Sequence, residues 1–269
     1  MPELPEVETT KNGLLPLLKN QMIVQAVRHR DNLRWEIPKI LETLMSHQVL
    51  LDINRRGKYL LMRFEVGTLI IHLGMSGSIK VVDSNTALLK HDHFELIFEH
   101  GKSMRLNDPR RFGAVLFSKD GKHPLLDALG VEPLEEMFDE TYLYNKSRNK
   151  VQNIKTFIMN SKVVVGVGNI YACESLFASG ISPTRQAGKV SKKRYALLSQ
   201  QIRDILNKSI QVGGTTLKDF SKVDGSPGYF AQTLNVYGRE GENCGACGGK
   251  IRRLIQNQRS TFYCPSCQT

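Results

Sequence analysis

The pattern of apolar and polar positions along the chain is first helical, then β, then helical again. Residues 5–20 predict a helix, because Pro5 suits a first helical position and apolar residues fall on one face. From about residue 22 to residue 117, short alternating runs are separated by turn signals such as His100-Gly101-Lys102, which predicts β-strands. The clearest predicted strands cover residues 49–53, 59–64, 69–71, 78–82, 93–98 and 114–117.

A helical pattern returns after about residue 134. Residues 191–212 predict the clearest helix, with Ser191 as its N-cap and Gly213 as its stop. Its apolar stripe is predicted to contain Ala196, Leu197, Ile202, Ile205, Leu206 and Ile210. Further helices are predicted at residues 134–144, 151–161 and 170–179. The glycine-rich residues that follow Gly213 predict a long loop, and loops of this length are usually functional or disordered.

The charge of the chain favours a polyanionic partner. The 269 residues carry a formal net charge of +11, and the sequence pI is about 9.5. Such a surplus favours nucleic acid over an ordinary basic protein whose charge only aids solubility, because the basic residues gather at predicted turns. They form the groups Arg55, Arg56 and Lys58; Arg110 and Arg111; Lys192, Lys193 and Arg194; and Arg252 and Arg253.

Membrane and secretory signals are not expected. The first residues carry Glu3, Glu6 and Glu8, where a secretory signal needs a basic start and an apolar run. No stretch of about 18 apolar residues occurs, so the sequence predicts no membrane span. We therefore expect a cytoplasmic protein in a reducing compartment.

Four of the five cysteines lie in the last 26 residues. Cys244-Gly-Ala-Cys247 and Cys264-Pro-Ser-Cys267 are separated by sixteen residues, a spacing that brings four thiolates around one tetrahedral ion. Zinc suits four soft ligands with no redox task, and the site predicts one structural Zn²⁺. Reduced structural cysteines or a redox pair are the alternatives. Cys173 stands apart and is predicted to be a small buried residue.

The N-terminus offers a second candidate chemistry. Met1 precedes a small residue, so its removal is expected, and this leaves a secondary amine on Pro2 that can attack an aldehyde-like carbon. Glu3 is a neighbouring acid, whereas Glu6 is expected to face elsewhere on the helix. Proline is common at this position, so the residue types alone do not establish such a nucleophile.

Three segments change this interpretation, because they resemble bacterial formamidopyrimidine-DNA glycosylases. They are Met1-Pro2-Glu3-Leu4-Pro5-Glu6-Val7-Glu8-Thr9, Gly166-Val-Gly-Asn169-Ile170-Tyr171, and Gln258-Arg259-Ser-Thr-Phe-Tyr-Cys264-Pro-Ser-Cys267. Four further motifs occur in the order that the family has: Arg55-Arg56-Gly57-Lys58-Tyr59-Leu60, His72-Leu-Gly-Met75-Ser-Gly77, Lys90-His91-Asp92-His93 and Asp108-Pro109-Arg110-Arg111-Phe112-Gly113. The resemblance covers nearly the whole chain.

The resemblance implies an α+β fold with a zinc finger. Residues 1–130 are expected to form a catalytic, β-sandwich-like domain with flanking helices. Residues 131–230 are expected to form a helix–two-turn–helix domain with a lesion-covering loop, and residues 235–269 a β-hairpin zinc finger. Double-stranded DNA with oxidised purines or abasic sites is the implied partner, and the chain is expected to be a nucleoid-associated monomer that binds DNA in a basic cleft between its domains.

The resemblance also implies roles for four catalytic residues. Pro2 attacks the anomeric carbon of the damaged nucleotide and forms a Schiff base, while Glu3 acts as an acid on the sugar. Lys58 serves in β-elimination, and Arg259 serves in δ-elimination. The implied product is a one-nucleotide gap with 5′ and 3′ phosphates.

A further set of residues is expected to bind DNA. A base inside the duplex is out of reach, so the nucleotide must be flipped out. Met75, Arg110 and Phe112 match the family's void-filling residues, although the pattern alone favours core packing for the two apolar ones. Phosphate contacts are implied for His72, His91, Arg111, Lys150, Lys155 and Asn169, with Lys150 one position away from the family's usual basic residue. Residues 215–229 correspond to the cover over the extruded purine.

Two other functions remain open from the sequence. An endonuclease VIII-type glycosylase for oxidised pyrimidines shares the proline nucleophile, but it usually has glycine where Leu4 stands and other void-filling residues. A non-enzymatic zinc-ribbon DNA-binding protein would explain the charge and the cysteines. It gives no reason for Pro2-Glu3 together with Lys58.

Overall fold

The computed structural model describes residues 2–214 and 234–269, and these divide into two compact units. One unit contains residues 2–127 and 212–214, and the other contains residues 128–211 and 234–269. The predicted loop at residues 215–229 lies outside the described residues. Within the described residues, the helices include none that is long and apolar enough to cross a membrane.

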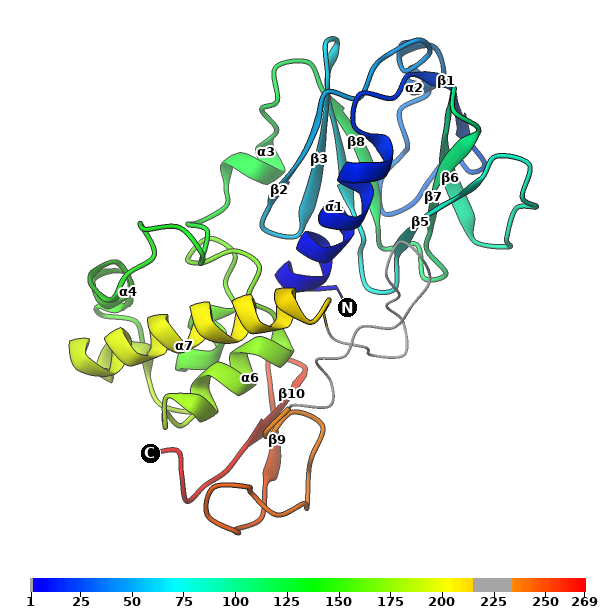
Figure 1. Cartoon of the computed structure of the whole chain (residues 1–269). Helices are drawn as coiled ribbons and strands as arrows, with labels where there is room; N and C mark the ends of the chain where they lie inside the picture. Colours follow the sequence, from blue (N-terminus) through cyan, green and yellow to red (C-terminus); the bar gives the residue numbers. More distant parts are fainter. Residues whose placement is uncertain (1, 215–233) are drawn as a thin grey trace. The chain divides into compact units, whose positions relative to one another are not determined.

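The first unit begins with helix α1 (Leu4–Leu18), which confirms the predicted N-terminal helix. Glu3 is its N-cap and a proline occupies the first turn. The buried side chains of Val7, Leu14 and Leu18 join the core, and the helix contacts strands β2 and β3 (Figure 1).

Two antiparallel four-stranded sheets follow, which confirms the predicted β-rich domain. One sheet has the order β1-β6-β7-β5 and the other β2-β3-β4-β8. The strands are β1 (Ile23–Arg28), β2 (Asp52–Arg56), β3 (Tyr59–Phe64), β4 (Gly67–His72), β5 (Ser78–Asp83), β6 (Asp92–Phe98), β7 (Lys102–Asn107) and β8 (Ala114–Ser118). Two short helices, α2 (Leu41–Leu44) and α3 (Pro124–Asp127), complete the unit.

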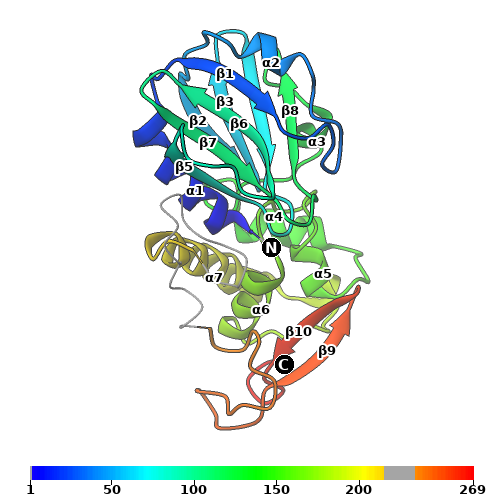
Figure 2. The same ribbon diagram turned by 90° about the vertical axis from the view of Figure 1, so that its right-hand side faces the viewer.

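The two sheets share one hydrophobic core, with one sheet in front of the other in Figure 2. Leu60, Met62 and Phe64 alternate inward along β3, and they belong to the same cluster as Phe94 and Leu96 of β6. Burial of alternate side chains from facing sheets is the packing of a β-sandwich, and it confirms the predicted fold class.

The second unit is helical. Its helices are α4 (Glu140–Ser147), α5 (Ile154–Ile158), α6 (Asn169–Ala178), the short 3-10 helix η1 (Ala187–Lys189) and α7 (Lys192–Gln211). Helix α7 packs against α4 and α6, and its first turn is capped by Ser191, as predicted. The predicted stripe is partly wrong: Ile202 and Leu206 are buried, but Leu197 is exposed and Tyr195 and Leu198 take the inward positions.

The predicted helix at residues 134–144 begins later than expected. Asp139 caps α4 by accepting a hydrogen bond from the backbone N–H of Tyr142 at 2.7 Å. Before it, the carbonyl groups of Glu135 and Phe138 accept hydrogen bonds from the guanidinium of Arg203. A side chain from α7 therefore satisfies groups that a longer helix would have used internally.

The chain ends in a two-stranded hairpin formed by β9 (Arg252–Gln256) and β10 (Arg259–Tyr263). Helix α6 carries the residues that join this tail to the helical part. Glu174, which is 2% exposed, accepts hydrogen bonds from the backbone N–H groups of Asn235, Val236 and Tyr237, each at 2.9 Å. The side-chain amide of Asn235 adds a fourth bond at 3.1 Å.

Replacement of this carboxylate should loosen the tail. Glu174→Ala leaves three backbone N–H groups without their acceptor, and we expect the free energy of unfolding to fall by roughly 3 kcal/mol. Glu174→Gln keeps one acceptor oxygen and should lose less. Chemical denaturation measures the stability, and amide hydrogen exchange at residues 235–237 locates the change. Asp204→Ala, which removes an exposed carboxylate from α7, is the matched control. Unchanged exchange at residues 235–237 in Glu174→Ala would contradict the anchoring role.

Candidate functional site

The N-terminal residues are held against the start of α1. Pro2 is buried, and Glu3 and Glu6 are 2% and 3% exposed. The carboxylate of Glu6 accepts a hydrogen bond from the backbone N–H of Glu3 at 2.8 Å, as part of a reciprocal capping box. The expectation that Glu6 faces elsewhere is therefore wrong, because its side chain folds back to cap its own helix. Met1 lies outside the described residues, so its removal stays a prediction.

An ion pair ties this helix to the turn that carries Lys58. The guanidinium of Arg55 in β2 donates to the carboxylate of Glu8 in α1 at 2.6 Å and to the carbonyl of Gly57 at 3.0 Å. Burial alone would raise the pKa of Glu8, but hydrogen bonds from Lys11 and Arg55 outweigh it and the pKa is lowered. Glu8 therefore stays ionised, and the β2–β3 turn with Lys58 is fixed to the helix that begins beside Pro2.

His72 ends β4 at the same end of the sheet as this turn. It pairs with Tyr59 on one side and with Ala114 on the other, and its ring lies 4.8 Å from that of Tyr59. The backbone N–H of Gly74 donates to Nδ1 of His72 at 3.0 Å, so a neutral ring carries its proton on Nε2. Burial, with the positive charges of Lys58 and Arg34, lowers the pKa of His72 to about 4.

The predicted void-filling residues lie on two turns beside this sheet end. Met75 lies in the turn after β4, while Arg110 and Phe112 lie in the turn before β8, together with Arg111, whose φ is 59°. Phe112 is 46% exposed and the guanidinium of Arg110 lies 5.4 Å from its ring centroid. Core packing is therefore excluded for Phe112, whereas Met75 is half-buried.

The two turns are in direct backbone contact. A Cβ atom on Gly74, whose φ is 65°, would lie 2.4 Å from the backbone nitrogen of Gly113, so only glycine fits this approach. Buried Asp108 accepts hydrogen bonds from the hydroxyl of Ser76 at 3.1 Å and from the N–H of Gly113 at 2.7 Å. The backbone carbonyl of His91 accepts from the N–H of Asp108 at 3.0 Å, which places His91 beside the same turn. Asp108 begins one of the motifs that resemble the family, but the sequence alone does not reveal its bracing role, because a buried carboxylate that joins two turns has no pattern of its own.

In the second unit, two of the predicted phosphate-binding residues hold the hairpin. Lys155 is 1% exposed, and its ammonium donates to the carbonyl of Ser260 at 3.2 Å and to the hydroxyl of Thr261 at 2.7 Å. The side-chain amide of Asn169, at the start of α6, donates to the same carbonyl of Ser260 at 2.9 Å. Both side chains thus position the backbone that follows Arg259.

Arg259 is the first residue of β10, next to a tight turn. Asn257 and Gln258 have φ values of 46° and 60°, which fits the two-residue hairpin turn that reverses the chain. Arg259 and Lys155 help to line a pocket of about 290 Å³, together with residues of α5 and the hairpin. Lys150 is exposed between α4 and α5, and its carbonyl accepts from the N–H of Gly188 at 2.9 Å.

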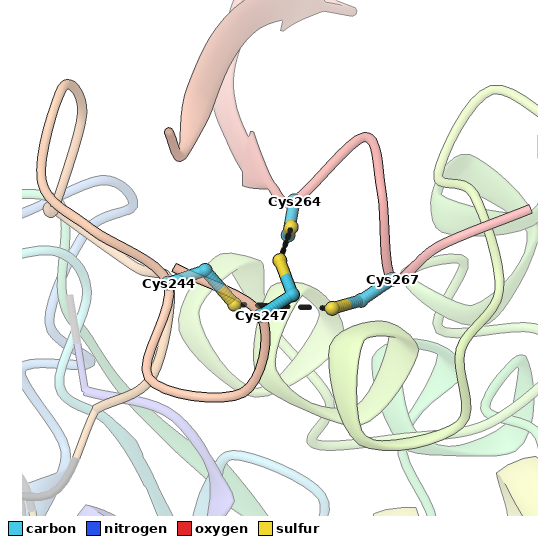
Figure 3. Close-up of side chains that lie close together, drawn as sticks. All are labelled: Cys244, Cys247, Cys264 and Cys267. Atoms are coloured by element: carbon cyan, nitrogen blue, oxygen red, sulfur yellow. Dashed lines mark hydrogen bonds between the residues drawn. The ribbon is translucent and has the colours of Figure 1, made fainter. Parts of the chain in front are cut away.

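The four C-terminal cysteines converge on one point (Figure 3), as predicted. Their sulfur atoms all lie within 4.8 Å of one another, with 3.9 Å between Cys244 and Cys267 and 3.5 Å between Cys247 and Cys264. Tetrahedral zinc with Zn–S bonds of about 2.3 Å requires sulfur separations of about 3.8 Å, so the residues fit one structural Zn²⁺. Hydrogen bonds from Cys247 and Cys264 raise the pKa of the Cys267 thiol to about 12, and a bound cation would reverse this.

A small apolar cluster lies under these sulfurs. Cys173 of α6, which is 1% exposed, packs with Val236, Ile251 and two of the zinc-site cysteines. The prediction that Cys173 is a buried small residue is confirmed. The zinc site and α6 thus stabilise a tail that is too small to form a core of its own.

Comparison with family models covers most of the chain. Residues 1–115 match the N-terminal domain of formamidopyrimidine-DNA glycosylase, and residues 129–221 match its helix–two-turn–helix domain. Residues 241–269 match a zinc finger that occurs in this glycosylase and in isoleucyl-tRNA synthetase.

Individual relatives align over the full length. The chain is 67% identical to a formamidopyrimidine-DNA glycosylase of Ruthia magnifica and 50% identical to one of Idiomarina loihiensis, and each alignment covers 100% of both chains. Among solved structures, the MutM (Fpg) protein of Thermus thermophilus matches with a TM-score of 0.90 and 37% identity, covering 99% of this chain and 98% of that one. A Lactococcus lactis Fpg variant in complex with DNA that contains Fapy-dG matches with a TM-score of 0.89 and 30% identity, over 100% of both chains.

Removal of the metal should affect the tail alone. We expect one zinc per chain, and a chelator in excess should release it, unfold the β9–β10 hairpin and abolish DNA binding. The first unit should stay folded, which the fluorescence of Trp35, the only tryptophan, reports. Cys264→Ala should lose the metal, whereas Cys173→Ala should keep one zinc per chain. Unfolding of the first unit on chelation would contradict the prediction that the metal stabilises the tail alone.

The state of His72 gives a prediction on pH. Its pKa is lowered from 6.5 to about 4, so it is neutral at pH 7 and gains a proton only in strong acid. In the unfolded chain the ring takes up its proton near pH 6.5. The folded state therefore keeps its full stability, as far as His72 is concerned, above about pH 6.5, and it loses stability as the pH falls from 6.5 toward 4. NMR titration of the ring should show a midpoint near 4, and the stability difference from His72→Gln should shrink over the same range. A midpoint near 6.5 would contradict the prediction.

Proposed function

Because the chain belongs to the formamidopyrimidine-DNA glycosylase family, we propose that it excises 8-oxoguanine and formamidopyrimidines from duplex DNA through a covalent intermediate on Pro2. The chain is a DNA glycosylase with abasic-site lyase activity in base excision repair of oxidised purines, as its family is. One observation carries the finer proposal: the Arg55–Glu8 ion pair joins the helix that begins beside Pro2 and Glu3 to the turn with Lys58.

The first step needs a nucleophile and an acid. After loss of Met1, the Pro2 nitrogen attacks the anomeric carbon of the damaged nucleotide. The bond to the base breaks with its electrons leaving on the base, which takes up the proton that the Pro2 nitrogen gives up. Glu3 protonates the sugar ring oxygen as the ring opens, and the Pro2 nitrogen is left in an iminium bond. Burial of Pro2 and Glu3 supports this proposal, because a site that excludes water protects the iminium from hydrolysis.

Strand cleavage follows from the acidity that the iminium gives to the sugar. Removal of a proton next to the iminium carbon expels the 3′ phosphate in β-elimination, and a second elimination expels the 5′ phosphate. We assign Lys58 to the first of these steps and Arg259 to the second. The position of Arg259 at the hairpin tip, on backbone held by Lys155 and Asn169, supports a fixed contact to the leaving phosphate.

The remaining residues hold the distorted duplex. Met75, Arg110 and Phe112 are proposed to fill the space left by the flipped nucleotide, and the exposure of Phe112 supports this. The proposed phosphate contacts are His72, His91, Arg111, Lys150, Lys155 and Asn169. For His72, the contact would be donated by the neutral Nε2–H group.

The proposed partner is double-stranded DNA that contains oxidised purines or abasic sites. Structural relatives described as Fpg in complex with DNA containing Fapy-dG, and with DNA containing an abasic site, support this choice. We further propose that the chain acts as a monomer at the bacterial nucleoid, and that residues 215–229 cover the extruded purine.

The nucleophile can be tested directly by borohydride trapping. On a duplex with one 8-oxoguanine opposite cytosine, we expect a covalent adduct that peptide mapping places on Pro2, and a gap with phosphates at both ends in the untrapped reaction. An N-terminal extension, which turns the Pro2 amine into a peptide bond, should abolish the adduct and keep DNA binding. Pro16→Ala, which changes an exposed proline of the same helix, should trap like the wild type.

The other outcomes distinguish the alternatives. An adduct only on a duplex with an oxidised pyrimidine would assign the chain to the endonuclease VIII type. Tight binding with no adduct on either duplex, from protein shown to lack Met1, would leave a non-enzymatic DNA-binding protein.

A further inference from the structure

The segment between β1 and α2 presents an exposed aromatic–cation pair. Trp35 is 37% exposed, and the guanidinium carbon of Arg34 lies 4.6 Å from its ring centroid. Arg34 is itself exposed. Neither residue belongs to the catalytic, void-filling or phosphate-binding sets described above, so the pair needs another explanation.

The backbone of this segment is held in place. The N–H of Leu33 donates to the carbonyl of Trp35 at 2.9 Å, and the N–H of Ile37 donates to the carbonyl of Asp31 at 2.8 Å. The guanidinium of Arg28 donates to the carbonyl of Ile37 at 3.1 Å. Arg34 is therefore presented from an ordered turn, which lowers the entropy lost when its side chain binds a partner.

A backbone hydrogen bond places the pair next to the void-filling turn. The N–H of Arg34 donates to the carbonyl of Gly113 at 3.1 Å, directly after Phe112. Ala114 then pairs with His72, which pairs with Tyr59 beside Lys58. Arg34 thus lies at the sheet end that carries the proposed DNA contacts, and its charge contributes to the lowered pKa of His72.

The chemistry of the pair favours an anion. Within residues 2–214 and 234–269, no carboxylate forms an ion pair with Arg34. The N–H groups of a guanidinium lie in its own plane, so they stay available when the group lies over an indole ring. Their geometry matches the oxygens of a phosphate. The exposed part of the indole suits the C–H groups of a deoxyribose.

We infer that Arg34 and Trp35 form a further contact with the sugar–phosphate backbone of duplex DNA, next to the void-filling turn. This inference rests on the proposed function, because it takes the end of the β2-β3-β4-β8 sheet to face DNA. Arg34 binds one phosphate, and Trp35 orients the guanidinium and packs against the adjoining sugar.

The single tryptophan makes the contact measurable without a label on the protein. The probe is a duplex with a reduced abasic-site analogue, which binds but cannot form a Schiff base. Titration of the wild type should change the fluorescence of Trp35. Arg34→Ala should weaken binding by roughly 5-fold to 10-fold, and the slope of log K against log salt should fall in size by about 0.9, the value for one phosphate contact.

The control is a cation at the far end of β8, the strand that begins directly after Gly113. Lys119 is exposed and follows β8, so it lies about 20 Å from Gly113 at the strand rise of about 3.3 Å per residue. Lys119→Ala should leave both affinity and salt slope unchanged. Because the hydrogen bond to Gly113 comes from the backbone N–H, Arg34→Ala keeps it, and Arg34→Gln serves as a second variant if the first is unstable.

Two outcomes separate the inference from the proposed function. If the wild type binds and cuts lesion DNA but Arg34→Ala and Arg34→Gln bind with its affinity and salt slope, the inference is overturned and the proposed function stands. If the wild type neither binds the duplex nor cuts at 8-oxoguanine, the proposed function fails, and the inference fails with it.

Discussion

The antiparallel pairing of β3, β4 and β8 is the constraint on which the first unit's site depends. It fixes Tyr59 opposite His72 and His72 opposite Ala114, and so it brings together turns that are far apart in the sequence. A slip of one residue would turn the side chains of a strand to the other face, and the shared sandwich core prevents this. Hydrophobic packing in the sandwich core therefore sets the positions of Lys58, Met75 and Phe112, although the core is formed by other side chains. Asp108 then sets the local geometry by joining the turns of Met75 and Phe112.

The second unit solves a different problem, because its tail has too little apolar surface to fold alone. Two buried charged side chains hold the tail in place by hydrogen bonds. Lys155 and Glu174 are almost fully buried, and burial of an ionised group is unfavourable unless hydrogen bonds replace its water. The carboxylate of Glu174 accepts four N–H groups, and the ammonium of Lys155 donates to two oxygens of β10. Such networks fix a single arrangement, because any displacement leaves a buried charge unpaired. The zinc site completes the tail, and two of its cysteines pack in one apolar cluster with Cys173 of α6.

Much of this could be predicted from the sequence, since its signals are local. Two matched cysteine pairs define the metal site, and alternation of apolar residues defines the strands. The predictions that were wrong involve distant partners. The helix expected from residue 134 begins at Glu140, since Arg203 takes the preceding carbonyls, and Leu197 is exposed since the buried face of α7 is set by packing. Glu6 folds back to cap its own helix, which its spacing from Glu3 allows but does not require. The bracing roles of Asp108 and Glu174 were not predicted, because their main partners include backbone N–H groups, which every residue but proline carries.

Electrostatics explains why the sheet end combines charged and neutral donors. Lys58 and Arg34 both act on His72, and a third positive charge among them would be repelled by both. The lowered pKa of His72 avoids this, because the ring stays neutral and still offers an Nε2–H donor. An anion that approached this sheet end would meet the positive charge of Arg34 together with the neutral Nε2–H donor of His72. The net charge of the chain is +11, and contacts between its cations and DNA phosphates release counterions. The affinity for DNA is therefore expected to fall as the salt concentration rises.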